Sequence, residues 1–216
     1  MIAVEQVDGV QVVTMDGGEN RFDLDLVTEL DQVLAKAAEV AAPLVLTGSG
    51  KFFSNGLHLD WIGQADGGDA TAMFDRLYQV LGRMLSFPGA TVTAVNGHAF
   101  GAGAILAVSG DFRVMREDRG YVCFPEVDLG MTMSAEFDAV LRAALPLPVY
   151  REAVVTGRRY SGEAAREVGL VHATAPADGL VAAAVDLVRD LTGKPGSHVA
   201  ALKRQLHADA LAVLAR

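Results

Sequence analysis

The sequence predicts an α/β fold whose last third is mostly helical. From the N-terminus to Phe124, short apolar and β-branched runs alternate with amphipathic helical segments, which is the pattern of a sheet covered by helices. After Pro125, apolar residues recur almost throughout at helical spacing. No low-complexity segment or sequence repeat interrupts this order, although a loose strand-strand-helix rhythm is present.

The N-terminal part is predicted to form a β-hairpin, a helix and a strand. Ile2–Val7 and Val10–Met15 are β-rich runs around Asp8-Gly9, a dipeptide that accepts positive φ in a two-residue hairpin turn. Apolar residues over 26–37 recur at helical spacing. The short apolar run Pro43–Thr47 then predicts a strand that ends in a glycine-containing loop.

The central part is predicted to alternate helices with short strands. Amphipathic spacing over Met73–Leu85 predicts a helix, which Pro88-Gly89 ends. A buried strand follows at Thr91–Val95, and Asn96-Gly97 forms the next turn. The remaining elements here are a small-residue helix at Gly101–Ser109 and the strands Phe112–Met115 and Tyr121–Phe124, joined by the charged turn Arg116–Arg119.

The part after Pro125 is predicted to be helical, with one short strand at Leu170–Ala173. Its helices are expected at Ser134–Ala144, Tyr150–Thr156, Ser161–Val168, Leu180–Leu191 and Val199–Leu214.

Composition excludes several classes of protein. The chain has 216 residues, of which 51% are hydrophobic and 21% charged, as in an ordinary globular protein. The formal charge of −9 argues against a nucleic-acid partner, but it leaves room for a small anionic ligand. The N-terminus does not resemble a signal peptide, and the apolar run Ala102–Val108 is too short to span a bilayer. Cys123 is the single cysteine, so no intrachain disulfide can form and a cytoplasmic location is expected.

Three loop segments carry residues suited to chemistry, namely Lys51–Leu59, Asn96–Ile105 and Phe124–Gly130. The second is a turn rich in glycine and alanine before a buried helix, where small residues let a ligand approach backbone N–H groups. Both a phosphate cradle and tight helix packing are open interpretations. The spacing matches neither G-x-G-x-x-G nor a Walker motif.

Taken together, the three segments resemble the crotonase (enoyl-CoA hydratase/isomerase) superfamily. Its F-S-x-G-x-D-L signature corresponds to Phe53–Leu59, its N-G-x-x-x-G-x-G run to Asn96–Gly103, and its P-E-x-x-L-G motif to Pro125–Gly130. The motifs follow the family's order and spacing along nearly the whole chain. One such match means little, but three in order are specific. His58 departs from the pattern, because the family usually has Asp there.

The resemblance implies a crotonase-type spiral of ββα units over residues 1–160, which holds the acyl-CoA site. It implies a C-terminal helical region over 161–216 that mediates assembly into a homotrimer or a dimer of trimers. The implied substrate is an acyl-CoA thioester, with CoA as part of the substrate and no separate cofactor or metal. Two backbone N–H groups hold the thioester oxygen in the family, and the corresponding residues are Leu57 and Ala102. Such donors stabilise the negative charge that develops on that oxygen.

Within the family, the chain is most similar to Δ3,Δ2-enoyl-CoA isomerases, and the stretch Arg113–Glu126 resembles those of plant peroxisomes. Hydratases of the family use two glutamates, whereas this chain has Ile105 at one of the two positions and Glu126 at the other. One carboxylate suffices to move a proton from C2 to C4, and an apolar neighbour helps to exclude water. We expect burial to raise the pKa of Glu126 above the value of about 4.3 of a free glutamate. The residues expected to bury it are Ile105, Phe124, Val127 and Leu129.

The resemblance also assigns further residues to substrate binding, with the two lysines expected to contact CoA phosphates. They are Lys51, Phe53, Ser54, Gly56, His58, Leu59, Gly101, Ile105 and Lys203.

Several alternatives remain open at this point. Glu126 can be read as a surface or capping carboxylate, and His58 as a packing or capping residue. Asp111 is expected to be a turn residue or a buried hydrogen-bonding residue, and Cys123 a buried, inert thiol. For the whole chain, the alternatives are another crotonase reaction, such as hydration, thioester hydrolysis or decarboxylation, or a non-catalytic acyl-CoA-binding protein.

Overall fold

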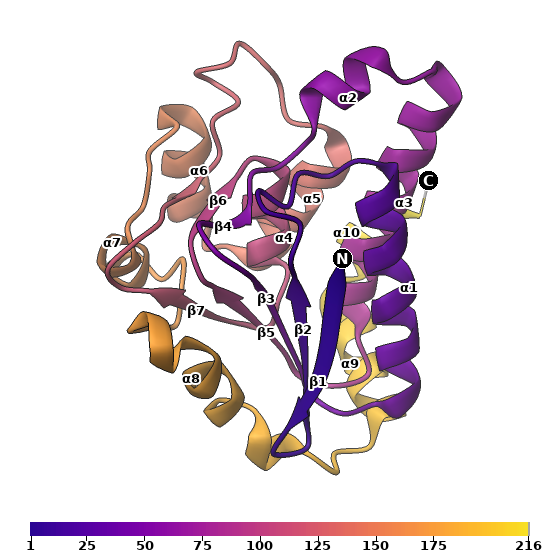
Figure 1. Cartoon of the computed structure of the whole chain (residues 1–216), viewed down its shortest axis with the longest axis vertical. Coiled ribbons are helices and arrows are strands. Elements are labelled where there is room, and N and C mark those ends of the chain that lie inside the picture. Colours follow the sequence, from indigo (N-terminus) through magenta and orange to yellow (C-terminus); the bar gives the residue numbers. More distant parts are fainter. Residues whose placement is uncertain (216) are drawn as a thin grey trace.

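A computed structural model describes residues 1–215, and these residues form two β-sheets with helices packed around them (Figure 1). The large sheet has the strand order β1-β2-β3-β5-β7-β9, and the small sheet has the order β4-β6-β8. Among residues 1–215, neighbouring strands of both sheets pair in parallel, except in the N-terminal hairpin. The predicted α/β class is therefore confirmed.

The N-terminal hairpin forms as predicted. β1 (Ile2–Val7) and β2 (Val10–Met15) pair antiparallel, with Val7 opposite Val10. Asp8 and Gly9 both have positive φ, 51° and 79°, as a two-residue turn of the type I′ class requires. The Asp-Gly dipeptide therefore sets both the position and the register of this hairpin.

Within the described residues, three consecutive units repeat one order: a strand of the large sheet, a strand of the small sheet, then helix. This is the ββα repeat that the family resemblance implied. The large-sheet strands are β3 (Leu44–Gly48), β5 (Thr91–Val95) and β7 (Phe112–Arg116), and their small-sheet partners are β4 (Phe52–Ser54), β6 (His98–Phe100) and β8 (Val122–Cys123).

Three elements of these units were not predicted. They are β4, β6 and α2 (Leu59–Gln64). Each is only three to six residues long, too short to show a period in the sequence. Neighbouring strands from distant parts of the chain stabilise β4 and β6, because each lies in the small sheet beside the strand of another unit.

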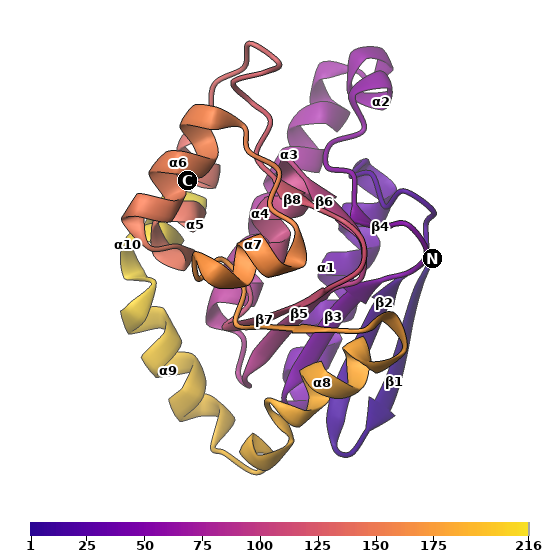
Figure 2. The same ribbon diagram turned by 90° about the vertical axis from the view of Figure 1, so that its left-hand side faces the viewer.

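Helices cover both faces of the large sheet. α1 (Leu24–Val40) and α3 (Gly67–Ser86) pack against each other on one face, and α8 (Leu180–Asp186) covers the opposite face (Figure 2). Side chains along each strand alternate between the two faces. In β3, for example, Leu44 and Leu46 belong to the main core while Val45 packs with the cluster beneath α8.

The main core also contains α4 (Ala102–Val108), whose residues are all buried. This helix of small residues was predicted over Gly101–Ser109 and is confirmed to within one residue at each end. It begins directly after the glycine turn, so its first residues lie where the small sheet ends.

The C-terminal part is helical as predicted, with shifted boundaries. The predicted helix Leu180–Leu191 is α8 followed by a 3-10 turn, and the predicted helix Val199–Leu214 is two helices separated at His207. The predicted strand at Leu170–Ala173 begins instead at Ala173, where pairing with Val114 of β7 starts. The elements are α5 (Ala135–Ala144), α6 (Leu147–Thr156), α7 (Gly162–Glu167), β9 (Ala173–Ala175), α9 (Gly196–Leu206) and α10 (Ala208–Leu214).

The last two helices fold back onto the core of their own chain. α9 packs against α3, and α10 packs against both α3 and α5. β9 and α8 also come from beyond residue 160, yet they complete the large sheet. The division of the chain at residue 160 stays a prediction. No helix within residues 1–215 has the length and apolar character needed to cross a membrane.

A buried ion pair fastens α9 to the large sheet. Lys203 is 7% exposed, and its Nζ donates to Oδ2 of Asp111 at 2.7 Å. The same oxygen accepts from the N–H and the hydroxyl of Thr91, at 2.7 and 2.9 Å. Burial lowers the pKa of Lys203, and the charge of Asp111 opposes that shift. The prediction that Asp111 is a structural hydrogen-bonding residue is confirmed.

Replacing Asp111 with alanine is expected to lower the free energy of unfolding by about 2 kcal/mol, because it leaves a buried ammonium and a buried N–H without their acceptor. Urea unfolding of the wild type and the variant measures this loss. Asp118→Ala is the matched control, since Asp118 pairs with Arg116 at the exposed surface and its removal should cause no measurable change. Equal effects of the two substitutions would contradict the role given to Asp111.

Candidate active site

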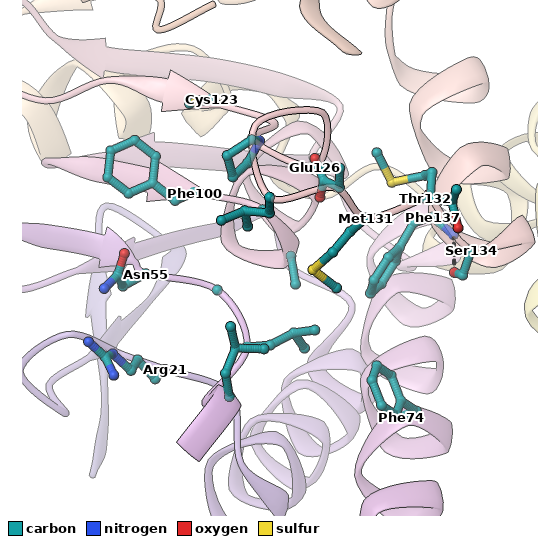
Figure 3. Close-up of a pocket in the computed structure, with 18 of the residues that line it drawn as sticks. Arg21, Asn55, Phe74, Phe100, Cys123, Glu126, Met131, Thr132, Ser134 and Phe137 are labelled. Carbon is teal, nitrogen blue, oxygen red and sulfur yellow. Dashed lines mark hydrogen bonds between the residues drawn. The ribbon is translucent and has the colours of Figure 1, made fainter. Parts of the chain in front are cut away.

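A cavity of about 530 Å³ opens where the small sheet meets α2, α3 and α5 (Figure 3). Its lining comes from segments far apart in the sequence, because each ββα unit contributes the loop after its small-sheet strand. The lining includes Arg21, Asn55, Gly56, Leu57, Leu59, Asp60, Phe74, Phe100, Gly101, Ala102, Glu126, Leu129, Met131, Ser134, Phe137 and Arg159.

Two backbone N–H groups at this cavity lack a hydrogen-bond partner in the described part of the chain. Leu57 follows β4, and Ala102 is the first residue of α4. Among residues 1–215, neither N–H donates a hydrogen bond to another protein group. The two segments are in contact, because a Cβ built at Gly56 would lie 2.6 Å from the Phe100 carbonyl oxygen and 3.4 Å from the Ala102 nitrogen. Gly56 also has φ +77°, so glycine is required there for both reasons.

A buried polar network holds the loop that carries Leu57. The Ser54 hydroxyl donates to the Asn20 carbonyl oxygen at 2.6 Å and accepts from the Gly56 N–H at 3.2 Å. The Asn20 side chain donates to the carbonyls of Met15 and Phe53. Asn20 was not predicted as part of the site, because its positive φ of 47° cannot be inferred from a single sequence.

α4 approaches this loop closely because Gly103 faces Ser54. A Cβ at Gly103 would lie 2.4 Å from the Ser54 carbonyl oxygen and 2.7 Å from its hydroxyl. No side chain fits in that space. Gly103 therefore has a packing role, because it allows the start of α4 to approach the loop that carries Leu57.

Glu126 lies in the turn that follows β8. The Pro125 carbonyl accepts from the N–H groups of Asp128 and Leu129, and the Glu126 carbonyl accepts from Met131 at 2.9 Å. These bonds hold the turn and direct the Glu126 side chain toward the cavity (Figure 3).

The Glu126 carboxyl is partly buried, and one of its two oxygens lacks a hydrogen-bond partner among the described residues. Its Oε2 is buried with no hydrogen-bond partner among the described residues, and its Oε1 lies 3.8 Å from where a Cβ on Gly101 would be. Burial raises the pKa of this carboxyl above its usual range, and a hydrogen bond from the Glu126 backbone lowers the pKa by less. The expected direction of the shift is thus found. A carboxyl of this kind is suited to accept a proton from a bound ligand.

The predicted surroundings of Glu126 were partly wrong. Phe124 is fully buried, but Val127 and Leu129 are 48% and 57% exposed, and of these two only Leu129 lines the cavity beside Glu126. Ile105 is fully buried in the main core and does not line the cavity. The lining therefore does not support its predicted contact with substrate, which stays a prediction.

Of the residues predicted to bind substrate, Gly56, Leu59 and Gly101 line the cavity. Phe53 and Ser54 do not, because both are fully buried, Phe53 in the core and Ser54 in the network described above. Lys51 also lies outside the lining, and its ammonium is 5.2 Å from the centre of the Phe52 ring. The predicted phosphate contact of Lys203 does not fit this structure, since its ammonium is buried against Asp111.

His58 caps α2 and does not line the cavity. Its Nδ1 accepts from the Trp61 N–H at 3.2 Å, which is the bond that an aspartate at an N-cap position makes. The substitution of His for the family's Asp therefore preserves a capping acceptor. The capping interpretation is supported, and the substrate contact of His58 stays a prediction.

Other lining residues were missed by the sequence reasoning. They include the cations Arg21 and Arg159 and an aromatic pair, Phe74 and Phe137. Helical spacing predicted the helices that carry Phe74 and Phe137, but it did not show which face of each helix lies toward the cavity. Among residues 1–215, no cluster of three or more His, Cys, Asp or Glu side chains could hold a metal ion.

Comparison with known proteins agrees with this arrangement. A family model described as enoyl-CoA hydratase/isomerase matches residues 5–216. The chain is 34% identical to enoyl-CoA delta isomerase 2, peroxisomal, of Arabidopsis thaliana, over 99% of this chain and 95% of that protein. It is 32% identical to enoyl-CoA delta isomerase 3 of the same plant, over 96% of this chain and 92% of that protein.

Solved structures show the same architecture. A probable enoyl-CoA hydratase of Mycobacterium tuberculosis superposes with a TM-score of 0.89 at 28% identity, covering 99% of this chain and 91% of that one. The apo structure of an Mtb enoyl-CoA isomerase gives a TM-score of 0.89 at 27% identity, covering 99% and 93% of the two chains.

Proposed function

This chain belongs to the enoyl-CoA hydratase/isomerase family, and we propose that it is an isomerase that moves the double bond of a 3-enoyl-CoA thioester to C2. The single observation that carries the proposal is the partly buried carboxyl of Glu126, whose Oε2 has no partner among residues 1–215, in a cavity that also presents two backbone N–H groups without a partner among those residues.

The proposed reaction needs one base and one stabilised oxyanion. Glu126 removes a proton from C2, so that the C2–H bond breaks and the negative charge passes to the thioester oxygen as a dienolate. The N–H groups of Leu57 and Ala102 stabilise this charge by hydrogen bonding. The protonated Glu126 then returns the proton to C4, which leaves the double bond between C2 and C3 and regenerates the carboxylate.

Isomerisation is favoured over hydration because a second catalytic carboxylate is lacking at the expected position. The hydratases of the family have a glutamate where this chain has Ile105, which is fully buried. Asp60 is the other carboxylate in the cavity lining, but it is largely exposed at the mouth, 4.0 Å from Arg21. The isomerase relatives agree with this choice. Trimeric assembly through the C-terminal helices stays a prediction.

The proposal is tested with purified protein and two substrates, a 3-enoyl-CoA and a 2-enoyl-CoA. Conversion of the first to a 2-enoyl-CoA, with little or no hydration of the second, supports isomerisation. Hydration at a comparable rate would favour the hydratase alternative. Release of free CoA or of CO₂ would favour thioester hydrolysis or decarboxylation. Tight binding without turnover would favour a non-catalytic acyl-CoA-binding protein.

The pH dependence of the reaction is a further prediction. Glu126 acts as a base only when it is deprotonated, and burial raises its pKa. The acid limb of kcat/KM, which reports the free enzyme, is therefore expected above the ordinary value of 4.5, with activity lost as the pH falls through the raised pKa. A pH profile of kcat/KM for 3-enoyl-CoA checks this. An acid limb at or below pH 4.5 would contradict the buried state of the base.

A further inference from the structure

The cavity has a polar end and an apolar end, with Glu126 between them (Figure 3). Arg21 and Asn55 lie at one end, and Phe74 and Phe137 at the other. An acyl-CoA has the same asymmetry, since its CoA part is polar and anionic and its acyl tail is apolar. With the thioester beside Glu126, the tail must point toward the two phenylalanines.

An aromatic cluster ends the cavity in that direction. Phe74 comes from α3 and Phe137 from α5, and Tyr78 packs behind both rings. Tyr78 meets Phe137 edge to face, with ring centres 5.6 Å apart and planes at 77°, and its ring centre is 6.2 Å from that of Phe74. Phe137 is only 7% exposed, so its ring fills space that would otherwise extend the cavity.

This aromatic cluster is held from two sides. The Tyr78 hydroxyl lies 3.5 Å from the hydroxyl of Ser134, which caps α5 by accepting from the Phe137 N–H. On the other side, α10 packs against both α3 and α5, and Leu211 and Leu214 approach Gly82 of α3. These contacts hold α3 and α5 in place around the cluster.

We propose that Phe137, backed by Tyr78 and flanked by Phe74, ends the acyl-binding pocket and makes the protein selective for short acyl chains. This pocket assignment depends on the proposed function in one respect, namely that the ligand is an acyl-CoA. Extra methylene groups of a long chain find no apolar space beyond Phe137, so they gain none of the binding free energy that burial normally supplies.

The test measures binding of two saturated thioesters, hexanoyl-CoA and dodecanoyl-CoA, which cannot be isomerised. The wild type is expected to bind dodecanoyl-CoA no more tightly than hexanoyl-CoA. Phe137→Ala is expected to shift the ratio of the two dissociation constants by about ten-fold or more in favour of dodecanoyl-CoA, and Phe74→Ala to shift it in the same direction. If Phe137→Ala does not fold, Phe137→Leu is the second variant, with a smaller shift in the same direction.

Phe112→Ala is the matched control. Phe112 is partly buried in the cluster beneath α8 and packs on His172, away from the cavity lining. Its substitution should leave the ratio unchanged. The inference is overturned if the wild type already prefers dodecanoyl-CoA by ten-fold or more, if the ratio does not move in the Phe137 and Phe74 variants, or if Phe112→Ala moves it equally.

The two proposals can fail separately. A protein that shows the shifted binding ratio but isomerises no enoyl-CoA would refute the proposed reaction and leave the pocket assignment standing. An active isomerase whose binding ratio does not respond to Phe137 or Phe74 would refute the pocket assignment alone.

Discussion

Replacing Glu126 with glutamine is expected to lower kcat/KM for 3-enoyl-CoA isomerisation by about 10²–10⁴-fold. Glutamine has nearly the shape of glutamate but cannot accept the C2 proton. Among the cavity-lining side chains, Asp60 is the other carboxylate, and Figure 3 shows the cavity side of Glu126 occupied mainly by apolar residues. Steady-state kinetics of the two proteins measure the loss.

Two controls separate loss of chemistry from loss of structure. Glu126→Gln should bind a saturated acyl-CoA about as well as the wild type, and its melting temperature should be no lower, because Oε2 has no hydrogen-bond partner to lose. Asp60→Asn changes another carboxylate at the mouth of the cavity and should retain most of the activity. A missing general base should lower the rate by at least about 10²-fold. If Glu126→Gln kept more than about a tenth of the wild-type rate, the proposed role of Glu126 would be wrong.

Replacing Ala102 with proline is expected to lower kcat by about 10²–10³-fold, because it removes one of the two N–H groups proposed to hold the thioester oxygen. A backbone donor cannot be removed by ordinary side-chain substitution, but this position allows proline. Ala102 is the first residue of α4, where no intrahelical bond depends on its N–H. The preceding residue, Gly101, has no Cβ to clash with a proline ring.

Ala135→Pro is the matched control for Ala102→Pro. Ala135 is the first residue of α5, and the residue before it, Ser134, has the extended backbone that a following proline requires. Both variants should keep their circular dichroism spectra, and only Ala102→Pro should lose the reaction. Similar kinetics of the two variants would argue against an oxyanion role for the Ala102 N–H.

Much of the fold could be predicted from the sequence where structure is decided locally. The hairpin at Asp8-Gly9 is correct to the residue, since a turn that needs positive φ twice admits few dipeptides. The amphipathic helices were located because their apolar residues recur at helical spacing, although the ends of these helices were shifted by several residues. β4 and β6 were missed, because three-residue strands depend on partners in other units.

The site was predictable to a similar extent. Leu57, Ala102 and Glu126 all line one cavity, as the three motifs implied. These positions depend on backbone N–H groups and on a turn, so the spacing of glycine and proline in the sequence is informative about them. Lys203 shows the opposite case, because its partner Asp111 is 92 residues away and nothing local to either residue reveals the pair.

The sequence by itself determined the α/β class, the family, the turns that present the two N–H groups, and the choice of Glu126 as the candidate base. The α/β class follows from residue type and spacing, and the other three follow from the family resemblance that the three motifs carry. Only the tertiary structure decided which side chains reach the cavity: it buried Ser54 and Ile105, and it brought Arg21 and Phe137 into the lining. The physical reason is that the direction of a side chain depends on the neighbours packed against its strand or helix, and those neighbours come from distant parts of the chain.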